Sequence, residues 1–349
     1  MERGRCHMAG IKDVAERAGV SISTVSYVMS GKRSVRQETK HRVMQAARDL
    51  GYFPNAGARM LRGERTNILA LSSPMHEYTD YTNYSAFFFA VAQRARRYGY
   101  DLLLLMGEDE TEDLMRMGDS GLVDGILLLD VTLDDPRVKC AKSCRVPMVS
   151  IGVPADTSDL YCVDLDFELM GRWAVERASA LGHRHVLLLG DREAAYDNGS
   201  NFIIRLRDSV FAAASECGMT VDFCPSVGRN AAEVEKSLDR VFVDGHGPTA
   251  IFGQCNLNEL GQVAEYLRER GLLIPRDVSL LALGTYGNAA SMSPPLDEIP
   301  MLPFTTCPRV VDVLMDIIEG KRELAGGVEL LPSKYLKRGS MGPAPGRTD

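Results

Sequence analysis

Residues 11–54 read IKDVAERAGVSISTVSYVMSGKRSVRQETKHRVMQAARDLGYFP, and this stretch decides the fold of the first part of the chain. Apolar residues recur at helical spacing from Ile11 to Ala18, and Gly19 follows, the residue type that best tolerates the left-handed conformation beyond a helix end. Ser21 stands where an N-cap is needed for a second short helix over Ile22–Ser30. Two short helices around one tight turn predict a helix-turn-helix.

A third helix is predicted over Gln37–Leu50, where it packs on the first two through its apolar positions. Ser34 and Gln37 have the S-x-x-Q spacing of a capping box for this helix. In the second helix, Val25 and Val28 form the inward stripe. The side chains expected to point away from the other helices, toward whatever this helix docks into, are Ile22, Ser23, Ser26 and Tyr27.

The charge of the chain is distributed unevenly along its length. Residues 1–66 carry 13 Lys and Arg against 6 Asp and Glu, a formal +7, so the remainder must carry −14 to give the formal −7 of the whole chain. A basic module attached to an acidic body concentrates phosphate-seeking charge at one end. A solvated helix face is the alternative for any single Lys or Arg. Together with the helix-turn-helix spacing, the excess indicates binding to double-stranded DNA.

The motifs IKDVAERAGVSISTVSYVMSGKRSV and ETKHRVMQAARDLGY-x-PNAGARMLRGERTN follow each other with correct internal spacing. They resemble the N-terminal end of the lactose-repressor (LacI/GalR) family of bacterial transcription regulators, and the resemblance continues more loosely through the rest of the chain. It implies a sequence-specific DNA-binding transcription regulator, a repressor, controlled by a small-molecule effector. It further implies a homodimer on a palindromic operator.

By this resemblance, three side chains of the second helix fall on positions that read base edges in the major groove: Ile22, Ser23 and Tyr27. Positions that contact phosphate or line the groove are Ser21, Thr24, Ser26, Ser30 and Thr39. Apart from the resemblance, Lys32 and Arg33 are expected to contact phosphate. Many family members carry Arg where this chain has Tyr27, and a phenol cannot grip guanine bidentately as Arg does. The operator of better-known members therefore cannot be assigned to this chain. Arg36 is a second departure, because the family often has Ser there.

Residues 55–66, NAGARMLRGERT, are too short to fold alone and correspond by resemblance to the family's hinge helix. In the family this helix orders when two copies pack over the minor groove of DNA. Asn55, Ala58 and Leu61 match at the expected register, and Leu61 falls on the position that wedges between base pairs and kinks the duplex. A plain charged linker, with Leu61 tucked against the body, is the alternative.

From Asn67 the pattern changes to apolar strands alternating with helices, which predicts an α/β fold with parallel sheets. We therefore expect an all-α helix-turn-helix domain followed by a periplasmic-binding-protein-like sensor of two doubly wound halves. The closing segments after Pro295 are expected to cross back between the halves. The predicted divisions are a disordered leader at 1–9, the DNA-binding domain at 10–54, the hinge helix at 55–66, an effector-binding and dimerisation domain at 67–340, and a tail at 341–349. Within the effector-binding domain, we expect one half to consist of residues 67–165 with 297–325 and the other of residues 166–296 with 326–340.

Effectors in such folds bind beyond the strand ends, between the halves. Arg205 matches the family arginine that hydrogen-bonds sugar hydroxyls, and Asp166 matches an aspartate in the preceding loop. The family's Asn-Asp and Asp-Asp pairs are replaced by Cys255-Asn256 and Gly284-Thr285, which removes carboxylates that grip paired hydroxyls. The first half gains apolar and aromatic loop residues at Met75, Tyr78, Tyr81, Tyr84 and Phe87. These changes favour a less polar metabolite over a sugar, or no effector, with loop packing as the alternative role of the aromatic residues. The predicted effector-binding residues are Met75, Tyr84, Asp166, Arg205, Asn256 and Thr285.

Other function classes lack their sequence signals. Residues 1–9 have no apolar core of a signal peptide, no stretch is apolar for long enough to span a membrane, and the eight cysteines form no C-x-x-C pair. We therefore expect a cytoplasmic protein with reduced thiols, no membrane contact, no metal and no cofactor. The GDSG at 118–121 and the pair His183 and His185 resemble a protease motif and metal ligands, but both lie at ordinary helix-to-strand junctions.

Two function classes remain after these exclusions. The first is the effector-controlled regulator, and the second is a sugar- or metabolite-sensing protein or an enzyme body whose basic end does not regulate transcription. An enzyme needs an acid/base pair in the cleft, where the sequence shows carboxylates to be missing. The segment after Tyr335 has no leucine heptads, so we expect dimers and not tetramers.

Overall fold

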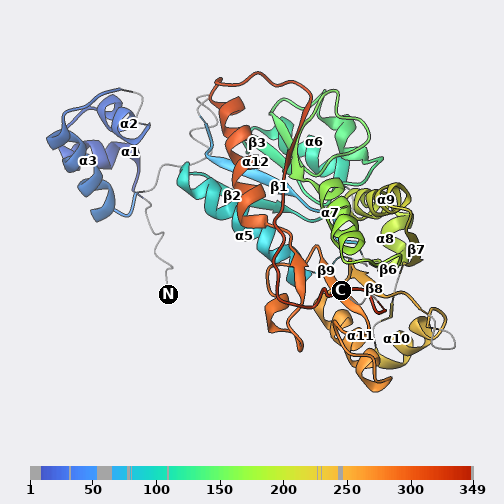
Figure 1. Cartoon of the computed structure of the whole chain (residues 1–349). Helices are drawn as coiled ribbons and strands as arrows, with labels where there is room; N and C mark the ends of the chain where they lie inside the picture. Colours follow the sequence, from blue (N-terminus) through green and yellow to red (C-terminus); the bar gives the residue numbers. More distant parts are fainter. Residues whose placement is uncertain are drawn as a thin grey trace, which may run out of the picture. The chain divides into compact units, whose positions relative to one another are not determined.

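The computed structural model describes the chain except for residues 1–8, 31–32, 53–64, 77–78, 80, 108–109, 226, 229, 243–246 and 347–349. The chain divides into two compact units, Met1–Thr66 and Asn67–Asp349. Figure 1 shows a small helical unit and a larger one built of strands and helices. In the part of the chain that the structure describes, no helix is long and apolar enough to cross a membrane.

The first unit contains α1 (Ile11–Ala18), α2 (Ile22–Ser30) and α3 (Gln37–Asp49), which confirms the three predicted helices. Gly19 ends α1 in the left-handed conformation, with φ 63° and ψ 41°. The Ser21 hydroxyl accepts a hydrogen bond from the Thr24 backbone N–H at 3.2 Å and so caps α2. Side chains of all three helices form one small core: Val14, Ala15, Ala18, Val25, Val28, Val43, Ala46 and Ala47.

The predicted capping box of the third helix is wrong. The N-cap of α3 is Arg36, and no side chain caps this helix. Because α3 begins at Gln37, Ser34 lies two residues before the cap and its spacing to Gln37 does not span the first turn.

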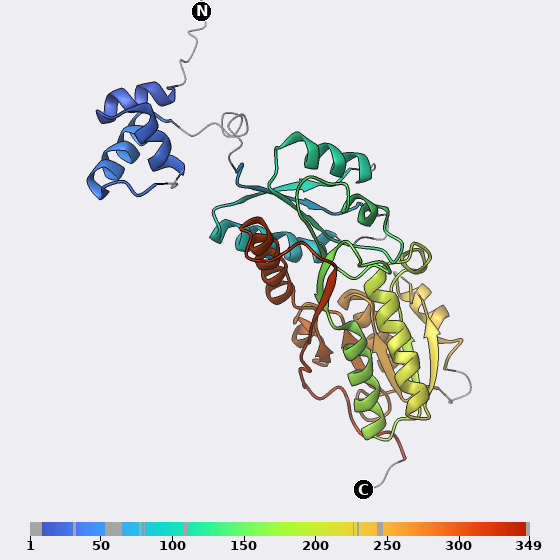
Figure 2. The same ribbon diagram turned by 90° about the horizontal axis from the view of Figure 1, so that it is seen from above.

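The second unit contains a six-stranded sheet in the order β11-β5-β4-β3-β1-β2, in which all neighbours are parallel. Its strands are β1 (Ile68–Ser72), β2 (Asp101–Leu105), β3 (Gly125–Leu128), β4 (Met148–Ile151), β5 (Tyr161–Leu165) and β11 (Gly327–Leu331). Its helical segments are α5 (Tyr81–Arg97), α6 (Glu110–Ser120), η1 (Pro136–Cys140) and α12 (Pro303–Ile318). Figures 1 and 2 show α12 lying beside α5, although more than two hundred residues separate them. We call this sheet with its helices the first lobe.

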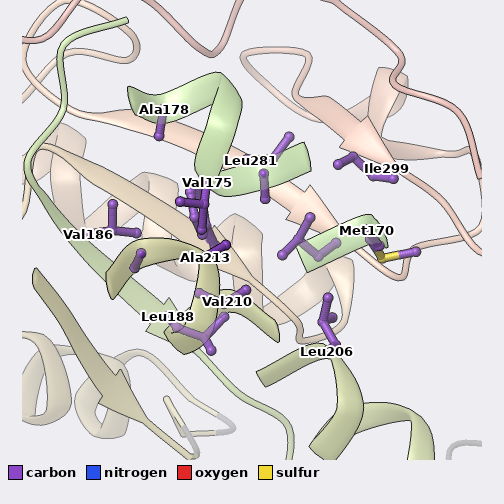
Figure 3. Close-up of a cluster of buried hydrophobic side chains, with 14 of the residues drawn as sticks. Met170, Val175, Ala178, Val186, Leu188, Leu206, Val210, Ala213, Leu281 and Ile299 are labelled. Atoms are coloured by element: carbon purple, nitrogen blue, oxygen red, sulfur yellow. The ribbon is translucent and has the colours of Figure 1, made fainter. Parts of the chain in front are cut away.

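A five-stranded parallel sheet in the order β10-β9-β8-β6-β7 forms the second lobe. Its strands are β6 (His185–Leu189), β7 (Thr220–Cys224), β8 (Ala250–Gly253), β9 (Ser279–Leu283) and β10 (Asp297–Ile299). Its helical segments are α7 (Phe167–Ala180), α8 (Glu193–Asp197), α9 (Asn201–Glu216), α10 (Ala231–Leu238), α11 (Leu257–Glu269) and η2 (Ala289–Ser291). In Figure 3, buried side chains of α7 and α9, such as Val175 and Val210, meet those of the sheet, such as Leu188 and Leu281.

The chain crosses between the lobes three times, after β5, between β10 and α12, and after β11, where Leu336 pairs with Glu298. The predicted return of the closing segments is therefore confirmed. The predicted division of these segments is corrected at two places, because β10 belongs to the second lobe and β11 to the first. The second lobe also continues past residue 340, since Met341 is buried and the Ala344 N–H donates to the Leu181 carbonyl.

Two strands and one helix of these lobes give weak signals in the sequence. Neither β5 nor β10 was anticipated, because Tyr161–Leu165 carries an aspartate and Asp297–Ile299 is short and acidic. Helix α12 begins at Pro303, and Pro308 lies inside it. Proline is tolerated in the first turn of a helix, which suits Pro303 at this start.

Gly171 allows the close approach of α7 to α9. A Cβ added there meets the Leu206 carbonyl oxygen of α9 at 2.9 Å and the Ser209 Oγ at 2.9 Å. The carbonyl belongs to a helix backbone and cannot rotate away. Gly261 in α11 is different, because its nearest neighbour is the flexible Met292 side chain at 3.4 Å.

We predict that Gly171→Ala lowers the free energy of unfolding by about 1–3 kcal/mol, because overpacking forces the two helices apart. Gly261→Ala is the matched control and should raise it by up to about 1 kcal/mol, because alanine favours a helix over glycine. Urea unfolding of the two variants measures both effects. An unchanged midpoint in Gly171→Ala contradicts the close packing of α7 on α9.

Candidate functional site

The outward face of α2 consists of exposed side chains on a well-packed helix. Val25 and Val28 are buried, whereas Ile22 is 45% and Tyr27 38% exposed. Ser23 is exposed too, and Ser26 is half-buried. A short helix that keeps large apolar side chains in water offers them to a partner, since its own core gains nothing from them.

Polar and cationic groups surround these apolar residues. The guanidinium of Arg33 lies over the Tyr27 ring at 5.6 Å from its centroid. At the start of α2 the Ser21 hydroxyl contacts those of Ser23 and Thr24 at 3.0 and 2.8 Å. Positive charge and hydroxyl donors around an exposed helix face suit the phosphates and base edges of a nucleic acid. The sequence pointed to these residues separately, but it did not show that Arg33 lies against Tyr27.

The remaining residues predicted to contact DNA are not part of the exposed face of α2 described above. Lys32, Asn55, Ala58 and Leu61 fall outside the described residues, as does the side chain of Ser30. Thr39 lies on α3 and is half-buried.

A cavity of about 300 Å³ lies between the two lobes. Tyr84 and Thr79 of the first lobe line it, together with the loops that follow β6, β8 and β9 in the second lobe. A smaller cavity of about 60 Å³ shares five of its wall residues, Tyr84, Phe167, Phe202, Tyr286 and Met301. The carboxyl ends of parallel strands are the usual place of a ligand in such sheets.

Three predicted effector residues line the larger cavity: Tyr84, Asn256 and Thr285. Asn256 also caps α11, because its side chain accepts from the Glu259 N–H at 3.0 Å. The hydroxyl of Thr285 donates to the buried carboxylate of Glu298. Both side chains are therefore fixed in place by hydrogen bonds within the protein.

Arg205 differs from its predicted role, because its guanidinium is bound within the protein and lines neither cavity. Its Nη1 donates to Asp164 Oδ2 at 2.6 Å, while Nε and Nη2 donate to the two Glu168 oxygens at 2.7 Å each. Burial acts to raise the pKa of Glu168, but Arg205 outweighs it and lowers that pKa. At Asp164 burial dominates over Arg205 and raises the pKa to about 6.

Asp166 and Met75 also lie away from the cavities. The side chain of Asp166 accepts the Leu169 N–H at 2.8 Å and caps α7, which explains an aspartate at this position by local structure. Met75 is 46% exposed on the loop after β1.

The interpretation that the cleft lacks carboxylates is wrong. Asp191 lines the larger cavity, and Asp130 and Asp164 line the smaller one. All three follow or end apolar strands, and this position was the signal in the sequence that could have identified them. The prediction rested on the pairs after β8 and β9 and on Asp166 after β5, whereas Asp130 and Asp191 follow β3 and β6.

Tyr84 and Asp130 join two elements of the first lobe at the cavity wall. The Tyr84 hydroxyl donates to Asp130 Oδ1 at 2.7 Å, and no described residue donates to Oδ2. Burial raises the pKa of Asp130, and the hydrogen bond from Tyr84 acts in the opposite direction. The pKa of Tyr84 is raised by burial and then by the charge of Asp130, so the phenol remains a donor.

The two lobes touch at both ends of this wall. Thr132 and Ser200 form a bridge between the loop after β3 and the start of α9, and the Leu133 N–H donates to the Gly199 carbonyl at 2.8 Å. At the other end the Phe87 and Tyr286 rings meet edge to face with centroids 6.3 Å apart. A ligand in the cavity therefore contacts both lobes and can alter their relative position.

The structure explains the two misleading motifs. His183 is fully buried, and its ring nitrogens contact Thr249 Oγ1 and Ser279 Oγ at 2.8 and 3.1 Å. Ser120 donates to the Met117 carbonyl at 2.9 Å at the end of α6. Among the described residues there is no cluster of three or more His, Cys, Asp or Glu that could hold a metal ion.

Comparison with known proteins gives the same two-part organisation. Residues 10–55 match the model of bacterial regulatory proteins, lacI family, and residues 175–341 match that of the periplasmic binding protein-like domain. The HTH-type transcriptional repressors PurR of Escherichia coli O1:K1 and of Salmonella arizonae are each 28% identical over 353 aligned positions, which cover 97% of this chain and 99% of theirs. The lac repressor dimer bound to operator and the anti-inducer ONPF has a TM-score of 0.77 at 22% identity, over 96% of this chain and 99% of that one. A transcriptional regulator CelR–cellobiose complex has a TM-score of 0.65 at 24% identity, over 95% and 99%.

We predict that Tyr84→Phe lowers the free energy of unfolding by about 1–3 kcal/mol at pH 8, because a buried carboxylate loses its donor. A carboxyl with a raised folded pKa stabilises the protein below its ordinary pKa of about 4 and loses this contribution as the pH rises through the folded value. The variant raises the folded pKa of Asp130 further, so the deficit should be larger at pH 8 than at pH 5. Urea unfolding at both pH values measures it.

Tyr98→Phe is the matched control. It removes a hydroxyl that donates to Asp312 at 2.8 Å, but Arg94 also binds this carboxylate. Its loss should stay under about 1 kcal/mol and be equal at the two pH values. A deficit in Tyr84→Phe that shrinks as the pH rises contradicts the assigned role of Asp130.

Proposed function

The chain belongs to the lacI family of bacterial regulatory proteins, and from this we propose that it is a dimeric transcriptional repressor controlled by a small molecule in the interlobe cavity. That it is a DNA-binding transcription regulator follows from its family. The observation that carries the proposed mechanism is the exposed face of α2, where Ile22 and Tyr27 stand in water on a module with a formal charge of +7.

We assign base recognition to Ile22, Ser23 and Tyr27 on this face. The ring of Tyr27 offers apolar contact to a thymine methyl group and its hydroxyl one hydrogen bond, while Arg33 beside it supplies the charge that Tyr27 lacks. Ser21, Thr24, Ser26, Ser30, Lys32, Arg33 and Thr39 are assigned to phosphate contacts and the groove wall. These contacts position the helix without reading sequence.

For residues 55–66 we propose the hinge helix, which orders on DNA as a pair. Asn55 and Ala58 then face the minor groove and Leu61 wedges between base pairs. Support comes from the composition of the segment, which is short, basic and rich in alanine, together with a leucine at the wedge position.

The effector is proposed to bind in the cavity of about 300 Å³, in contact with Tyr84 of the first lobe and with Asn256 and Thr285 of the second. Because its ligand contacts both lobes, binding changes their relative position and, through residues 55–66, the affinity for DNA. A sugar and a less polar metabolite are the two classes that the sequence left open.

A homodimer is supported by the edge of the first sheet. Strand β2 is an edge strand that reads DLLLL, and Leu103 and Leu104 are 39% and 40% exposed. Natural edge strands are protected by charge, proline or a covering element, because an apolar edge pairs with other chains. We propose that a second copy of the chain covers β2, because a two-fold symmetric DNA site is bound by a dimer.

An enzymatic role has less support. The relatives named above are transcriptional repressors, which fits a protein without catalytic activity. A regulator that binds bacterial DNA works in the cytoplasm, and this is the proposed location.

We predict that the chain binds a near-palindromic DNA site whose half-sites are about one helical turn apart, because a two-fold dimer presents two α2 helices. The logarithm of the affinity should fall with the logarithm of salt concentration at about −0.9 per neutralised phosphate. Footprinting and titration of salt measure these properties. Protection of a single half-site contradicts the dimeric reader.

Leu61→Ala separates the hinge from a plain linker in the same assay. It should weaken operator binding by about 1–3 kcal/mol and leave random DNA unaffected, because phosphate contacts do not require the kink. An equal loss on both DNAs, or unchanged bending in a circular-permutation gel, shows that residues 55–66 are a tether.

We predict that Leu104→Asp converts the dimer into a monomer at micromolar concentration, because a charge is buried at the interface without a partner. Light scattering should give twice the chain mass for the unchanged protein and once the chain mass for the variant. Leu324→Asp is the control, since Leu324 is 48% exposed but lies outside any strand. A dimeric Leu104→Asp variant contradicts an interface along β2, and four times the chain mass contradicts a dimer.

A further inference from the structure

The smaller cavity, of about 60 Å³, is enclosed mainly by rings and aliphatic side chains. Five of its wall residues are aromatic: Tyr84, Phe87, Phe167, Phe202 and Tyr286. It adjoins the larger cavity, because the two share five wall residues. The π-faces of such rings carry partial negative charge and attract cations.

The polar groups in this wall differ in whether they have partners. Asp164 accepts from the Leu165 N–H at 2.8 Å and from Arg205 at 2.6 Å, and Asn201 donates to the Val131 carbonyl. Asp130 is 6% exposed, and its Oδ2 has no partner among the residues that the structure describes. A buried carboxylate oxygen without a donor destabilises the protein, so this position favours a donor brought by a ligand.

The charge of the two cavity walls is negative. The described walls hold three carboxylates, Asp130, Asp164 and Asp191, and the guanidinium of Arg192, while Arg205 outside the walls compensates Asp164. His76 and Arg137, which line a third cavity with Asp130, act to lower the pKa of its carboxyl group. The guanidinium of Arg205 is shared between Asp164 and Glu168 and cannot receive an anion. Burial and then the charge of Asp191 raise the pKa of Glu259 behind this wall, as expected where negative charges crowd together.

We propose that the effector is a small organic cation, an amine with one ammonium group on a compact apolar or aromatic body. The ammonium donates to Asp130 Oδ2 and faces the surrounding rings, and the body extends into the larger cavity. An anion meets net negative charge, and a neutral sugar hydroxyl cannot compensate the charge of the buried Asp130 carboxylate as an ammonium group does. This inference rests on the proposed effector site and names the chemistry of its ligand.

The test is calorimetric titration of the full chain, without DNA, with benzylamine, benzyl alcohol and benzoate. The three probes share one ring and differ in the charge of the head group. We expect benzylamine to bind at least about tenfold more tightly than benzyl alcohol, the scale of one charge-assisted hydrogen bond, and benzoate not to bind. Equal binding of amine and alcohol, tighter binding of benzoate, or no binding of benzylamine at millimolar concentration overturns the proposal.

Asp130→Asn removes the charge and keeps the size of the side chain. It should lose about tenfold or more in affinity for benzylamine and change little toward benzyl alcohol. Asp197→Asn is the matched control, because Asp197 is exposed at the end of α8 and lines neither cavity. Equal benzylamine affinities in the two variants contradict the role of Asp130, and urea unfolding shows that each variant is folded.

DNA binding is measured separately by footprinting of the unliganded chain. If the chain binds benzylamine through Asp130 but protects no palindromic site, the inferred ligand class is supported and the proposed function is contradicted. If the chain protects such a site but binds no amine, only the inferred ligand class is contradicted.

Discussion

The body of this protein depends on one largely buried ion pair, that of Arg205 with Asp164, to which the exposed Glu168 adds a second carboxylate. Asp164 lies near the end of β5 in the first lobe, Glu168 in the first turn of α7 in the second, and Arg205 on α9. The contact holds the first crossing of the chain between the lobes and positions the neighbouring Phe167, whose ring lies 5.7 Å from the guanidinium. A charge buried in this way is stable only with its partners, so the cavity wall, which includes Asp164, is held in place by an ion pair within the protein.

The helical module could be predicted almost completely from the sequence. Its helices are defined by local signals, such as apolar spacing, Gly19 after α1 and the Ser21 cap, and each acts within a few residues. The cap of α3 was misjudged because S-x-x-Q spacing alone does not say where a helix begins. The parallel sheets followed from alternation, but β5 and β10 carry acidic residues, and burial between two layers is set by tertiary structure.

The candidate ligand site was predicted less well, for a physical reason. Tyr84 donates to Asp130, 46 positions away, and Arg205 to Asp164, 41 positions away, so no periodic pattern connects them. A resemblance can mark Arg205 as a position, but the acids that bind its guanidinium lie on other elements. Asp166 was marked in the same way and caps α7 instead. Such partners decide which side chains remain free to bind a ligand. They come together only in the folded chain, so the sequence alone does not identify them.

The late position of β11 in the chain has a consequence for synthesis on the ribosome. The first sheet is complete only when Gly327–Leu331 pairs with β5, and α12, which covers the same lobe, ends at Ile318. The helical module can fold as soon as it emerges, whereas the first lobe must wait for nearly the whole chain with β5 as an open edge. During that interval the second lobe can assemble from β6 to β9, which are contiguous in sequence. Vectorial synthesis therefore favours closing the N-terminal lobe last, and the nascent chain exposes β5 for longer than its place in the sequence suggests.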